Sequence, residues 1–481
     1  MPVAFYSTKG EFDLSNQVYS TVVDGTFCFP SHWHSYQVNQ YIIVVLEDLN
    51  GNIGLLLEIL RSNSTMSDDL LQPLKGSFSF LLYDRQARRL QVFRSLTADP
   101  VFYYHYSGKL VVSNELDSLR KYSRDLNTDY FKLYLHTELT ETEHTPYMGV
   151  KRILPAHKVV KEENREIVNK KYWSLTQENR DNNASLEEHI ETFASMLKDA
   201  VKKSVADQRI ISCEVSGGLD STSVAFLAEE NIGVKVYGHT YIFDKIEDGK
   251  PNKETVDIIY QQTDIVPNYL NLSNYWSFKH VKDEIKVYDE PSPLVLHSAM
   301  FHELNQSAKS MGSTVLLSGE GGDELLSSSS YYLRDLFLQG KMSQVWSHML
   351  KVSTKRKQPL WKIFCTYILP SLLPLKLRYR LENELNKQTW QNTGFSLTWY
   401  TTPSWIGDNL KGISFQEVEE ERRKIRDPSL KSIYLRENFE RFILINPCPW
   451  LNSNIGKPNG LKRIYPFRDQ RLIEFFLHCL R

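Results

Sequence analysis

The chain has 481 residues, of which 41% are hydrophobic and 24% are charged, so it is long enough for two globular domains with ordinary cores. Lysine and arginine number 57 against 58 aspartates and glutamates, and this balance gives no reason to expect nucleic acid or an anionic membrane as the main partner. The five cysteines lack the spacing of a zinc site or a redox motif, which favours reduced thiols in a cytoplasmic protein.

No segment predicts export or a membrane span. The N-terminus has no basic start followed by an apolar core. The most apolar stretch, residues 364–375, is too short to cross a bilayer and contains two prolines. We interpret it as buried helix ends rather than as a membrane contact.

The first third of the chain predicts an antiparallel β domain. It holds short apolar or alternating runs, rich in aromatic and β-branched residues and separated by polar turns, at residues 76–84, 89–94 and 109–113. We therefore expect a β-rich domain over residues 1–178.

The composition changes after this domain. Residues 174–184 are polar and loop-like, and Ser185 with Glu188 has the sequence of a capping box that opens a helix. We place a second domain at residues 185–481.

Strands and helices alternate at the start of the second domain. Residues 209–215, 234–242 and 313–318 read as buried strands, and residues 221–230 and 253–262 read as helices. This order predicts an α/β domain built on a parallel sheet. From about residue 327 onward the chain reads as mostly helical.

The first glycine-rich loop lies between a predicted strand and a predicted helix. In an open parallel sheet, ligands bind where loop amides and helix N-termini meet at the carboxyl ends of the strands. Paired glycines allow the backbone to surround an oxyanion, and hydroxyls add donors. No lysine stands at the Walker position, so the loop is not an ordinary γ-phosphate loop. The candidate ATP and pyrophosphate ligands here are Ser216, Gly217, Gly218, Leu219, Asp220, Ser221 and Thr222.

A carboxylate inside an anion-binding loop needs an explanation. Asp220 would repel phosphate unless a cation such as Mg²⁺ lies between them, although an acidic residue also favours a helix N-terminus by itself. A second acidic glycine-rich loop follows the third predicted strand and should open at the same sheet edge. Two such loops predict a shared nucleotide and a shared metal, with the second contributing Ser318, Gly319, Glu320, Gly321, Gly322 and Asp323.

These motifs resemble those of the asparagine synthetase family, the amide ligases of the PP-loop ATP pyrophosphatase type. The segments SGGLDST and SGEGGDELL match its two loops, and Asp289-Glu290-Pro291 and PFRDQRL resemble two further family motifs. The first third, with KGSFSFLLYD and VVSNELDSL, resembles the glutaminase-like, Ntn-type β-sandwich that precedes the synthetase domain.

The resemblance implies a reaction and a role for several residues. ATP and Mg²⁺ would be the cofactors, with Asp220 and Asp323 holding the metal. A carboxylate would be adenylated with loss of pyrophosphate, and an amine would then attack, with Glu320 as its general base. Glutamine-using relatives need a cysteine after the initiator methionine. Pro2 stands there, so we expect a degenerate glutaminase domain without glutamine hydrolysis.

Three kinds of relative work without glutamine hydrolysis. The resemblance favours a lasso-peptide cyclase, which joins an Asp or Glu side chain of a precursor peptide to its own N-terminal amine and works with a processing protease. An asparagine synthetase-like enzyme that uses ammonia is the alternative, whereas β-lactam synthetases carry a tyrosine where this chain has Glu320. A non-catalytic nucleotide- or peptide-binding homologue remains a further alternative.

The family also places a catalytic lysine after the PFRD-like motif, and this sequence ends at Arg481. Lys462, four residues before Pro466, is therefore our candidate for the catalytic cation, with Lys457 as a second choice. The other interpretation is that both lysines are solvated surface charges.

Overall fold

The computed structural model describes residues 4–7, 19–23, 27–30, 33–48, 51–63, 66–163, 165–175, 184–206, 208–231, 233–243, 250–279, 288–326, 332–373, 377, 405–410, 412–413, 415–430 and 432–479. The chain forms two compact units. The first comprises Met1–Asn127, Glu141–Leu325 and Asn446–Cys479, and the second comprises Thr128–Thr140, Leu326–Ile445 and Leu480–Arg481.

The first unit contains an antiparallel β-sandwich of two six-stranded sheets. One sheet has the order β10-β8-β9-β1-β3-β2 and consists of β1 (Ala4–Ser7), β2 (Tyr19–Val23), β3 (Phe27–Pro30), β8 (Val101–Tyr106), β9 (Lys109–Ser113) and β10 (Val150–Ile153). The other has the order β12-β11-β7-β6-β5-β4 and consists of β4 (Ser35–Val38), β5 (Tyr41–Asp48), β6 (Phe78–Asp84), β7 (Arg89–Arg94), β11 (His157–Glu162) and β12 (Val168–Lys171). The predicted antiparallel β architecture of the N-terminal region is thereby confirmed.

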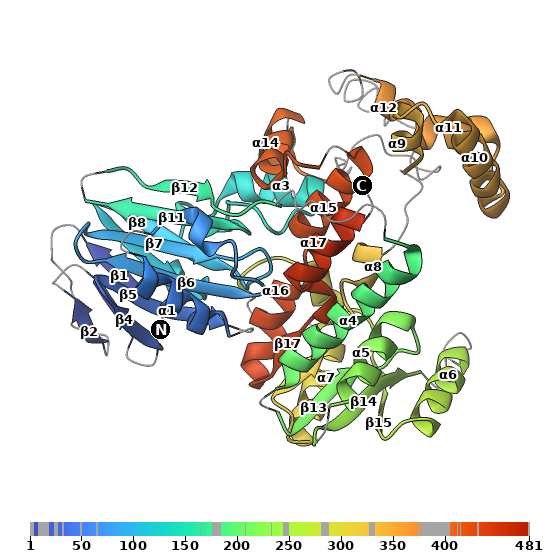
Figure 1. Ribbon diagram of the computed structural model, residues 1–481, viewed down its shortest axis with the longest axis horizontal. Coiled ribbons are helices and arrows are strands. Elements are labelled where there is room, and N and C mark those ends of the chain that lie inside the picture. The colour runs from blue at the N-terminus through green and yellow to red at the C-terminus, as the bar shows by residue number, and fades with distance from the viewer. Residues whose placement is uncertain are drawn as a thin grey trace. The chain divides into compact units, whose positions relative to one another are not determined.

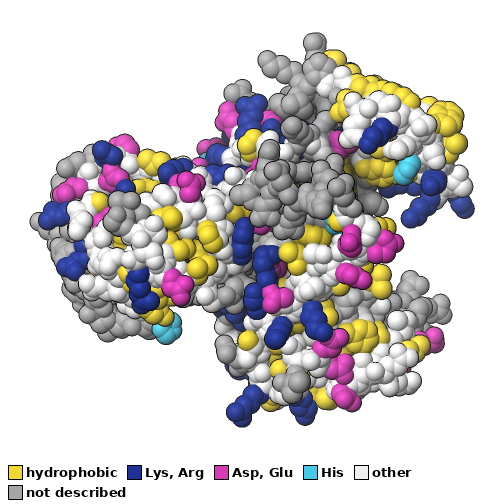
Figure 2. Space-filling model, in the orientation of Figure 1, with side chains coloured by type: hydrophobic (Ala, Val, Ile, Leu, Met, Phe, Trp, Pro, Cys, Tyr) yellow, Lys and Arg dark blue, Asp and Glu magenta, His cyan; other side chains and the backbone are white. Residues whose placement is uncertain are grey.

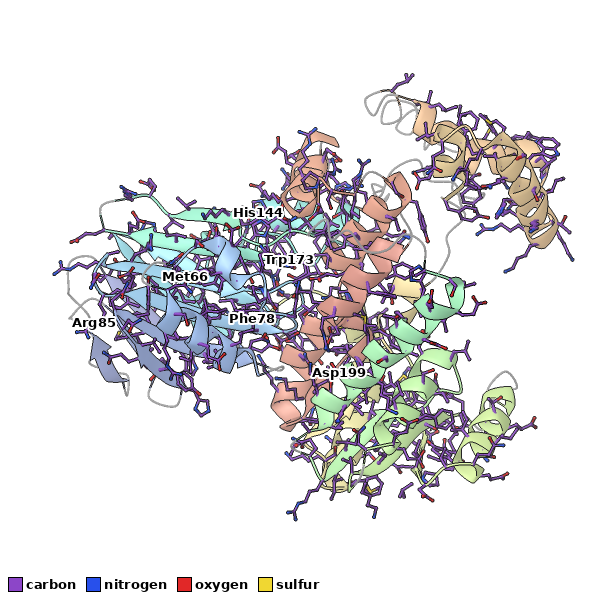
Figure 3. All side chains as sticks on the ribbon, viewed as in Figure 1. Met66, Phe78, Arg85, His144, Trp173 and Asp199 are labelled. Atoms are coloured by element: carbon purple, nitrogen blue, oxygen red, sulfur yellow. The ribbon has the colours of Figure 1, made fainter. Side chains whose placement is uncertain are left out.

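The core of the sandwich comes from both sheets. Leu81 and Val92 of one sheet pack in one buried cluster with Val101 and Val112 of the other. On the opposite face of the second sheet, the Phe80 and Phe93 rings are stacked at 4.8 Å. Figure 3 labels Phe78 and Trp173 in this part of the molecule. Successive side chains of a strand point to opposite faces of its sheet, and the apolar side chains that point between the two sheets form this core.

Short helices flank the sandwich. They are α1 (Asn52–Ser62), η1 (Asp68–Leu71) and α2 (Asp117–Arg120). In α1 the residues Ile53, Leu56 and Leu60 are buried, at the spacing of one helix face.

A five-stranded parallel sheet forms the second half of this unit, with the order β15-β14-β13-β16-β17. The strands are β13 (Ile210–Glu214), β14 (Lys235–Ile242), β15 (Val266–Asn271), β16 (Val315–Leu317) and β17 (Lys462–Ile464). The helices are α4 (Leu186–Val205), α5 (Leu219–Glu229), α6 (Lys250–Gln261), η3 (Pro293–His297), α7 (Ser298–Ser310) and α8 (Gly322–Leu326). The predicted parallel sheet is confirmed, and β15 and β17 add two strands that the sequence analysis did not predict.

Helix α4 begins as its sequence predicts. Glu188 N–H donates to Ser185 Oγ at 3.1 Å, and Ser185 N–H donates to Glu188 Oε2 at 2.6 Å. This reciprocal pair satisfies two N–H groups that the helix itself cannot use.

The segment after residue 445 joins the sandwich to the parallel sheet (Figure 1). It contains α16 (Cys448–Leu451), η6 (Asn452–Gly456), η7 (Lys457–Asn459), β17, η8 (Pro466–Arg468) and α17 (Gln470–Cys479). Glu474 of α17 pairs with Lys75 of the sandwich at 2.9 Å, and Asn452 donates to Asp99 at 3.1 Å. Arg471 pairs with Asp199 of α4, which is labelled in Figure 3.

The second unit is helical in its described part. Its helices are α3 (Thr128–Thr137), α9 (Tyr332–Leu338), α10 (Met342–Arg356), α11 (Leu360–Tyr367), α12 (Leu369–Leu372), η5 (Asp408–Leu410), α14 (Phe415–Ile425) and α15 (Ile433–Leu444). Arg422 of α14 and Arg426, which directly follows this helix, both pair with the buried Glu440 of α15. Along the described stretches, no helix combines the length and the apolar character that crossing a bilayer requires.

Candidate active site

The first glycine-rich loop connects β13 to α5 at the carboxyl edge of the parallel sheet. Gly217 has a φ of 79°, in the left-handed region that favours glycine. Ser216 N–H donates to Ser221 Oγ at 3.2 Å, and the two hydroxyl oxygens lie 2.9 Å apart. The two serines therefore close the loop, while the Leu219 side chain is 87% exposed and makes no part of the core.

One hydroxyl of this loop points to a ligand. Thr222 Oγ1 is buried and has no hydrogen-bond partner among the described residues. A buried polar atom without a partner is rare and costs free energy, so it requires an explanation such as a bound group. The anion-binding role predicted for the loop would supply one.

The second loop leaves the sheet at the same edge. Strand β16 runs parallel to β13, with Ser212 opposite Leu316 and Cys213 opposite Leu317. Because β13 and β16 are adjacent and parallel, the loops that follow them must emerge side by side. The structure thus brings together the two motifs that lie about a hundred residues apart in the sequence, as we expected.

The two loops touch through their backbones. A Cβ atom placed on Gly319 would lie 2.5 Å from the backbone nitrogen of Ser221. One placed on Gly322 would lie 2.4 Å from Cγ of Asp220. Real Cβ atoms do not approach this closely, so both positions require glycine for a steric reason.

This contact sets carboxylates side by side. Burial raises the pKa of Asp220, and the charges of Asp323 and Glu324 raise it further, whereas a hydrogen bond from the Asp323 backbone lowers it. Asp323 and Glu324 are exposed at the loop surface. A bound cation would reduce the repulsion between these like charges.

The donor set fits Mg²⁺. This ion prefers oxygen ligands and is commonly held by one or two carboxylates together with substrate phosphates. No group of three or more His, Cys, Asp or Glu side chains in the described ranges has a metal-binding arrangement. Asp220 and Asp323 would therefore hold the ion jointly with the oxygens of a bound nucleotide.

A buried polar network lies beneath both loops. Ser318 donates to Glu214 Oε2 at 2.5 Å, and Glu320 N–H donates to Ser318 Oγ at 3.3 Å. Glu214, the last residue of β13, also pairs with Arg463 of β17. The sequence analysis missed Glu214, although a glutamate at the end of an apolar strand is a signal for such a pair.

Glu320 lies within this network and beside the PFRD-like motif. Burial raises its pKa, Glu324 and Glu214 raise it further, and Arg468 and Arg463 lower it. Gly321 has a φ of 99°, and a Cβ there would lie 2.8 Å from Cγ of Arg468. Arg468 of this motif thus packs directly on the second loop.

Lys462 does not join these residues. It is the first residue of β17 and lies opposite Val315, the first residue of β16, whereas the loop follows the last residue, Leu317. Parallel strands carry their first and last residues to opposite edges of a sheet, so Lys462 lies at the other edge. There it lines a cavity of about 610 Å³ with Lys457, Glu47 and Asp99. The structure does not place Lys457 at the loops either.

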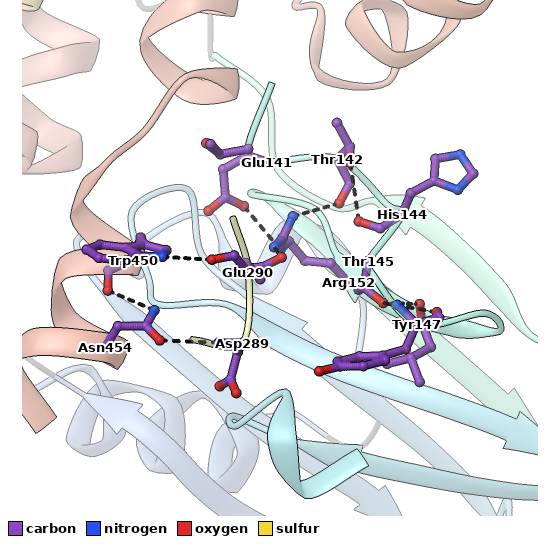
Figure 4. A network of polar contacts seen from close by, with 12 residues as sticks. Glu141, Thr142, His144, Thr145, Tyr147, Arg152, Asp289, Glu290, Trp450 and Asn454 are labelled. Carbon is purple, nitrogen blue, oxygen red and sulfur yellow. Dashed lines mark hydrogen bonds and ion pairs between the residues drawn. The ribbon is translucent and has the colours of Figure 1, made fainter. Parts of the chain in front are cut away.

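The Asp289-Glu290-Pro291 segment is held from two sides (Figure 4). Arg152 of β10 pairs with the Glu290 carboxylate, and Trp450 Nε1–H donates to the Glu290 carbonyl at 3.0 Å. Asp289 N–H donates to Asn454 at 3.4 Å. This network connects the sandwich, the segment before α7 and the segment after residue 445.

Comparison with known proteins agrees with this geometry. The family model described as asparagine synthase matches residues 192–479, and the model described as glutamine amidotransferase domain matches residues 58–173. The chain belongs to the asparagine synthase family. The second match agrees with the two-sheet sandwich. Pro2, on which the expectation of a degenerate glutaminase domain rests, lies outside the described residues.

The chain is similar to three curated proteins, of which two are asparagine synthetases and one is an amidase. A putative glutamine-hydrolyzing asparagine synthetase 2 from Methanocaldococcus jannaschii is 23% identical over 278 residues, which are 56% of this chain and 52% of that protein. A glutamine-hydrolyzing asparagine synthetase 3 from Bacillus subtilis is 23% identical over 290 residues, 56% of this chain and 45% of that protein. The amidase chyE from Penicillium rubens is 30% identical over 156 residues, 32% of this chain and 23% of that protein. The chain thus spans about half the length of these relatives or less.

Proposed function

We propose that this chain is an ATP-dependent amide ligase that forms AMP and pyrophosphate. A carboxylate oxygen of the substrate would attack the α-phosphorus, and pyrophosphate would leave. An amine would then attack the acyl carbon, AMP would leave, and the amine would lose one proton. The observation that carries this proposal is the backbone contact between the two glycine-rich loops, which sets Asp220 beside Asp323 at the carboxyl edge of the sheet.

The first loop would bind the phosphates. Its paired glycines, Gly217 and Gly218, leave backbone N–H groups at a helix N-terminus, where an anion is favoured. Mg²⁺ held by Asp220 and Asp323 would neutralise charge on the leaving pyrophosphate. The hydroxyl of Thr222, buried without a partner among the described residues, would donate to a phosphate oxygen.

Glu320 would accept the proton of the attacking amine. A carboxylate with a raised pKa is a stronger base than an ordinary one, and burial raises the pKa of Glu320. The backbone N–H of Glu320 donates to Ser318 Oγ, which holds the Glu320 backbone in place. Ser318 is held in turn by Glu214, which pairs with Arg463.

The identity of the amine is the finer part of the proposal. The motifs resemble those of lasso-peptide cyclases, which favours a precursor peptide whose Asp or Glu side chain is joined to its own N-terminal amine. The two asparagine synthetase relatives favour the alternative, in which ammonia is the acyl acceptor. Supplying aspartate with ammonia, or a peptide with a free N-terminus and an internal Asp or Glu, distinguishes the two.

The test is product analysis with labelled ATP and a panel of such carboxylates. We expect AMP and pyrophosphate, and we expect Asp220→Asn and Asp323→Asn each to slow pyrophosphate release by about a hundredfold or more, because a charged metal ligand is lost. Asp264→Asn, at an exposed position between α6 and β15, is the matched control and should keep full activity. ADP with inorganic phosphate, or unchanged turnover in both loop variants, would contradict the proposal.

Glu320→Gln separates the two half-reactions. We expect this variant to form pyrophosphate but to release little amide, because the amine proton has no acceptor. Loss of pyrophosphate formation with retained nucleotide binding would instead place Glu320 in the adenylation step.

A further inference from the structure

Helices α9 to α12, residues 332–373, form a cluster with its own core. Leu333 of α9, Val345 and Met349 of α10, and Ile363 and Tyr367 of α11 are all buried in one group. Because these side chains already hold the helices together, other apolar side chains on the same helices are not needed for the cluster itself.

A second set of large apolar side chains on this cluster is exposed. Trp361 is 67% exposed and Trp346 is 58% exposed, and the others are Leu338, Met342, Leu350 and Leu372. On α10 the residues Met342, Trp346 and Leu350 follow one another at a spacing of four, so they line one stripe of the helix. Figure 2 shows hydrophobic side chains gathered on the surface of this cluster, with basic side chains beside them.

The charge of the same helices is one-sided. Residues 336–373 contain six lysines and arginines and no aspartate or glutamate, whereas the whole chain has a net charge of −1. The basic residues are Lys341, Lys351, Lys355, Arg356, Lys357 and Lys362. All are exposed except the half-buried Lys362. The balanced composition of the chain therefore conceals a strongly basic surface with exposed tryptophans.

We propose that the α9–α12 cluster binds the surface of an anionic membrane. Trp346, Trp361 and the exposed aliphatic side chains would enter the boundary between headgroups and acyl chains. The lysines would contact lipid phosphates. Helices that lie in a bilayer surface combine these features, with Lys and Arg on the polar face and Trp and Leu on the other. The helices are too short to span: α10, with 15 residues, is about 22 Å long.

Two other partners fit less well. Protein interfaces are depleted in lysine, which is the commonest charged residue here. Nucleic acid would match the charge, but it offers no apolar environment for Met342, Leu350 and Leu372. Charge complementarity and exposed apolar area together favour anionic lipid.

The test is sedimentation of the full chain with vesicles of phosphatidylglycerol and phosphatidylcholine, compared with phosphatidylcholine alone. We expect binding to the anionic vesicles that weakens by about tenfold or more in high salt or on neutral vesicles, because attraction to anionic lipid is screened by salt. Tryptophan emission should shift to the blue on binding.

Two variants and two matched controls locate the surface. Trp346→Ser with Trp361→Ser, and Lys351→Gln with Lys355→Gln and Lys357→Gln, should each weaken vesicle binding about tenfold or more. Trp276→Ser, and Lys202→Gln with Lys203→Gln and Lys235→Gln, remove residues of the first unit that are also exposed, and should leave binding unchanged. All four proteins should retain the circular dichroism spectrum of the original chain.

Several results would overturn the proposal. These are absence of binding to anionic vesicles, equal loss of binding in the control variants, and binding to an acidic polypeptide or nucleic acid without binding to vesicles. Self-association in light scattering that disappears in the Trp346→Ser, Trp361→Ser protein, without vesicle binding, would show that a second copy of the chain covers this face. Pyrophosphate release measured without lipid tests the proposed function separately.

Discussion

Among single residues, Asp289 has a carboxyl group whose pKa is raised by its surroundings. Burial, as the largest cause, and the nearby Asp117 and Glu290 carboxylates together raise its pKa to about 6. Its pKa in an unfolded chain is about 4. Between these two values the folded protein binds more protons than the unfolded protein, so Asp289 makes the fold less stable as the pH rises through this window.

Replacing this carboxylate should therefore have a pH-dependent effect. We expect Asp289→Asn to raise the thermal unfolding midpoint relative to the original chain above about pH 6, and we expect the gain to vanish as the pH falls toward about 4. Asp125→Asn, an exposed residue, is the control and should show no such trend. A constant difference across the pH range would mean that Asp289 is not protonated preferentially in the folded state.

At the scale of elements, the sequence predicted those features that depend on neighbouring residues. The capping box at Ser185 uses residues only three apart, and the strand at Arg89–Arg94 is a single short run between turns, so local patterns were sufficient. Strand β17 has only three residues, Lys462–Ile464, and two of them are basic. Nothing local distinguishes it from a loop, and it exists because β16 provides its partner.

The same limit applies to the candidate site. The glycines and acidic residues of both loops were named from the sequence, because their type and order are unusual. Whether Lys462 reaches the loops depended on the direction and register of β17, which a sequence pattern does not contain. The pair between Glu214 and Arg463 joins strands that lie far apart in the chain and was missed for the same reason.

The contact between the two loops yields a prediction at this scale. Gly322→Ala would place a methyl group 2.4 Å from Cγ of Asp220, so one loop must move away. Overpacking of this kind typically costs about 1–3 kcal/mol. We expect pyrophosphate release to fall by about tenfold or more while the protein stays folded. Gly54→Ala in α1 meets no atom within 4 Å and should be neutral or stabilising by up to about 1 kcal/mol.

Within the whole molecule, Arg152 connects the sandwich to the segment that precedes α7. Its side chain is 1% exposed, and Arg152→Met would remove the cation paired with Glu290, whose side chain is 18% exposed. Removing one partner of a buried pair typically costs about 3–5 kcal/mol. We expect this loss in urea unfolding, and we expect Glu290→Gln added to Arg152→Met to recover part of it.

The control for this pair is an ion pair at the surface. Arg165 is 76% exposed and pairs with Glu162 at 2.7 Å. Arg165→Met should change the free energy of unfolding by less than about 1 kcal/mol. An equal decrease in the free energy of unfolding in Arg152→Met and Arg165→Met would show that the buried pair stabilises the fold no more than the surface pair.

The position of β17 at the edge of the parallel sheet also determines when the site can form during translation. Glu214 and Ser318 leave the ribosome long before Arg463, the buried partner of Glu214, which follows Glu214 by 249 residues. Residues 326–445, most of the second unit, are synthesised in this interval and can pack first. The nascent chain therefore carries both glycine-rich loops for many seconds before the strand that supports them exists, and the carboxyl edge of the sheet is complete only after β17 has been synthesised.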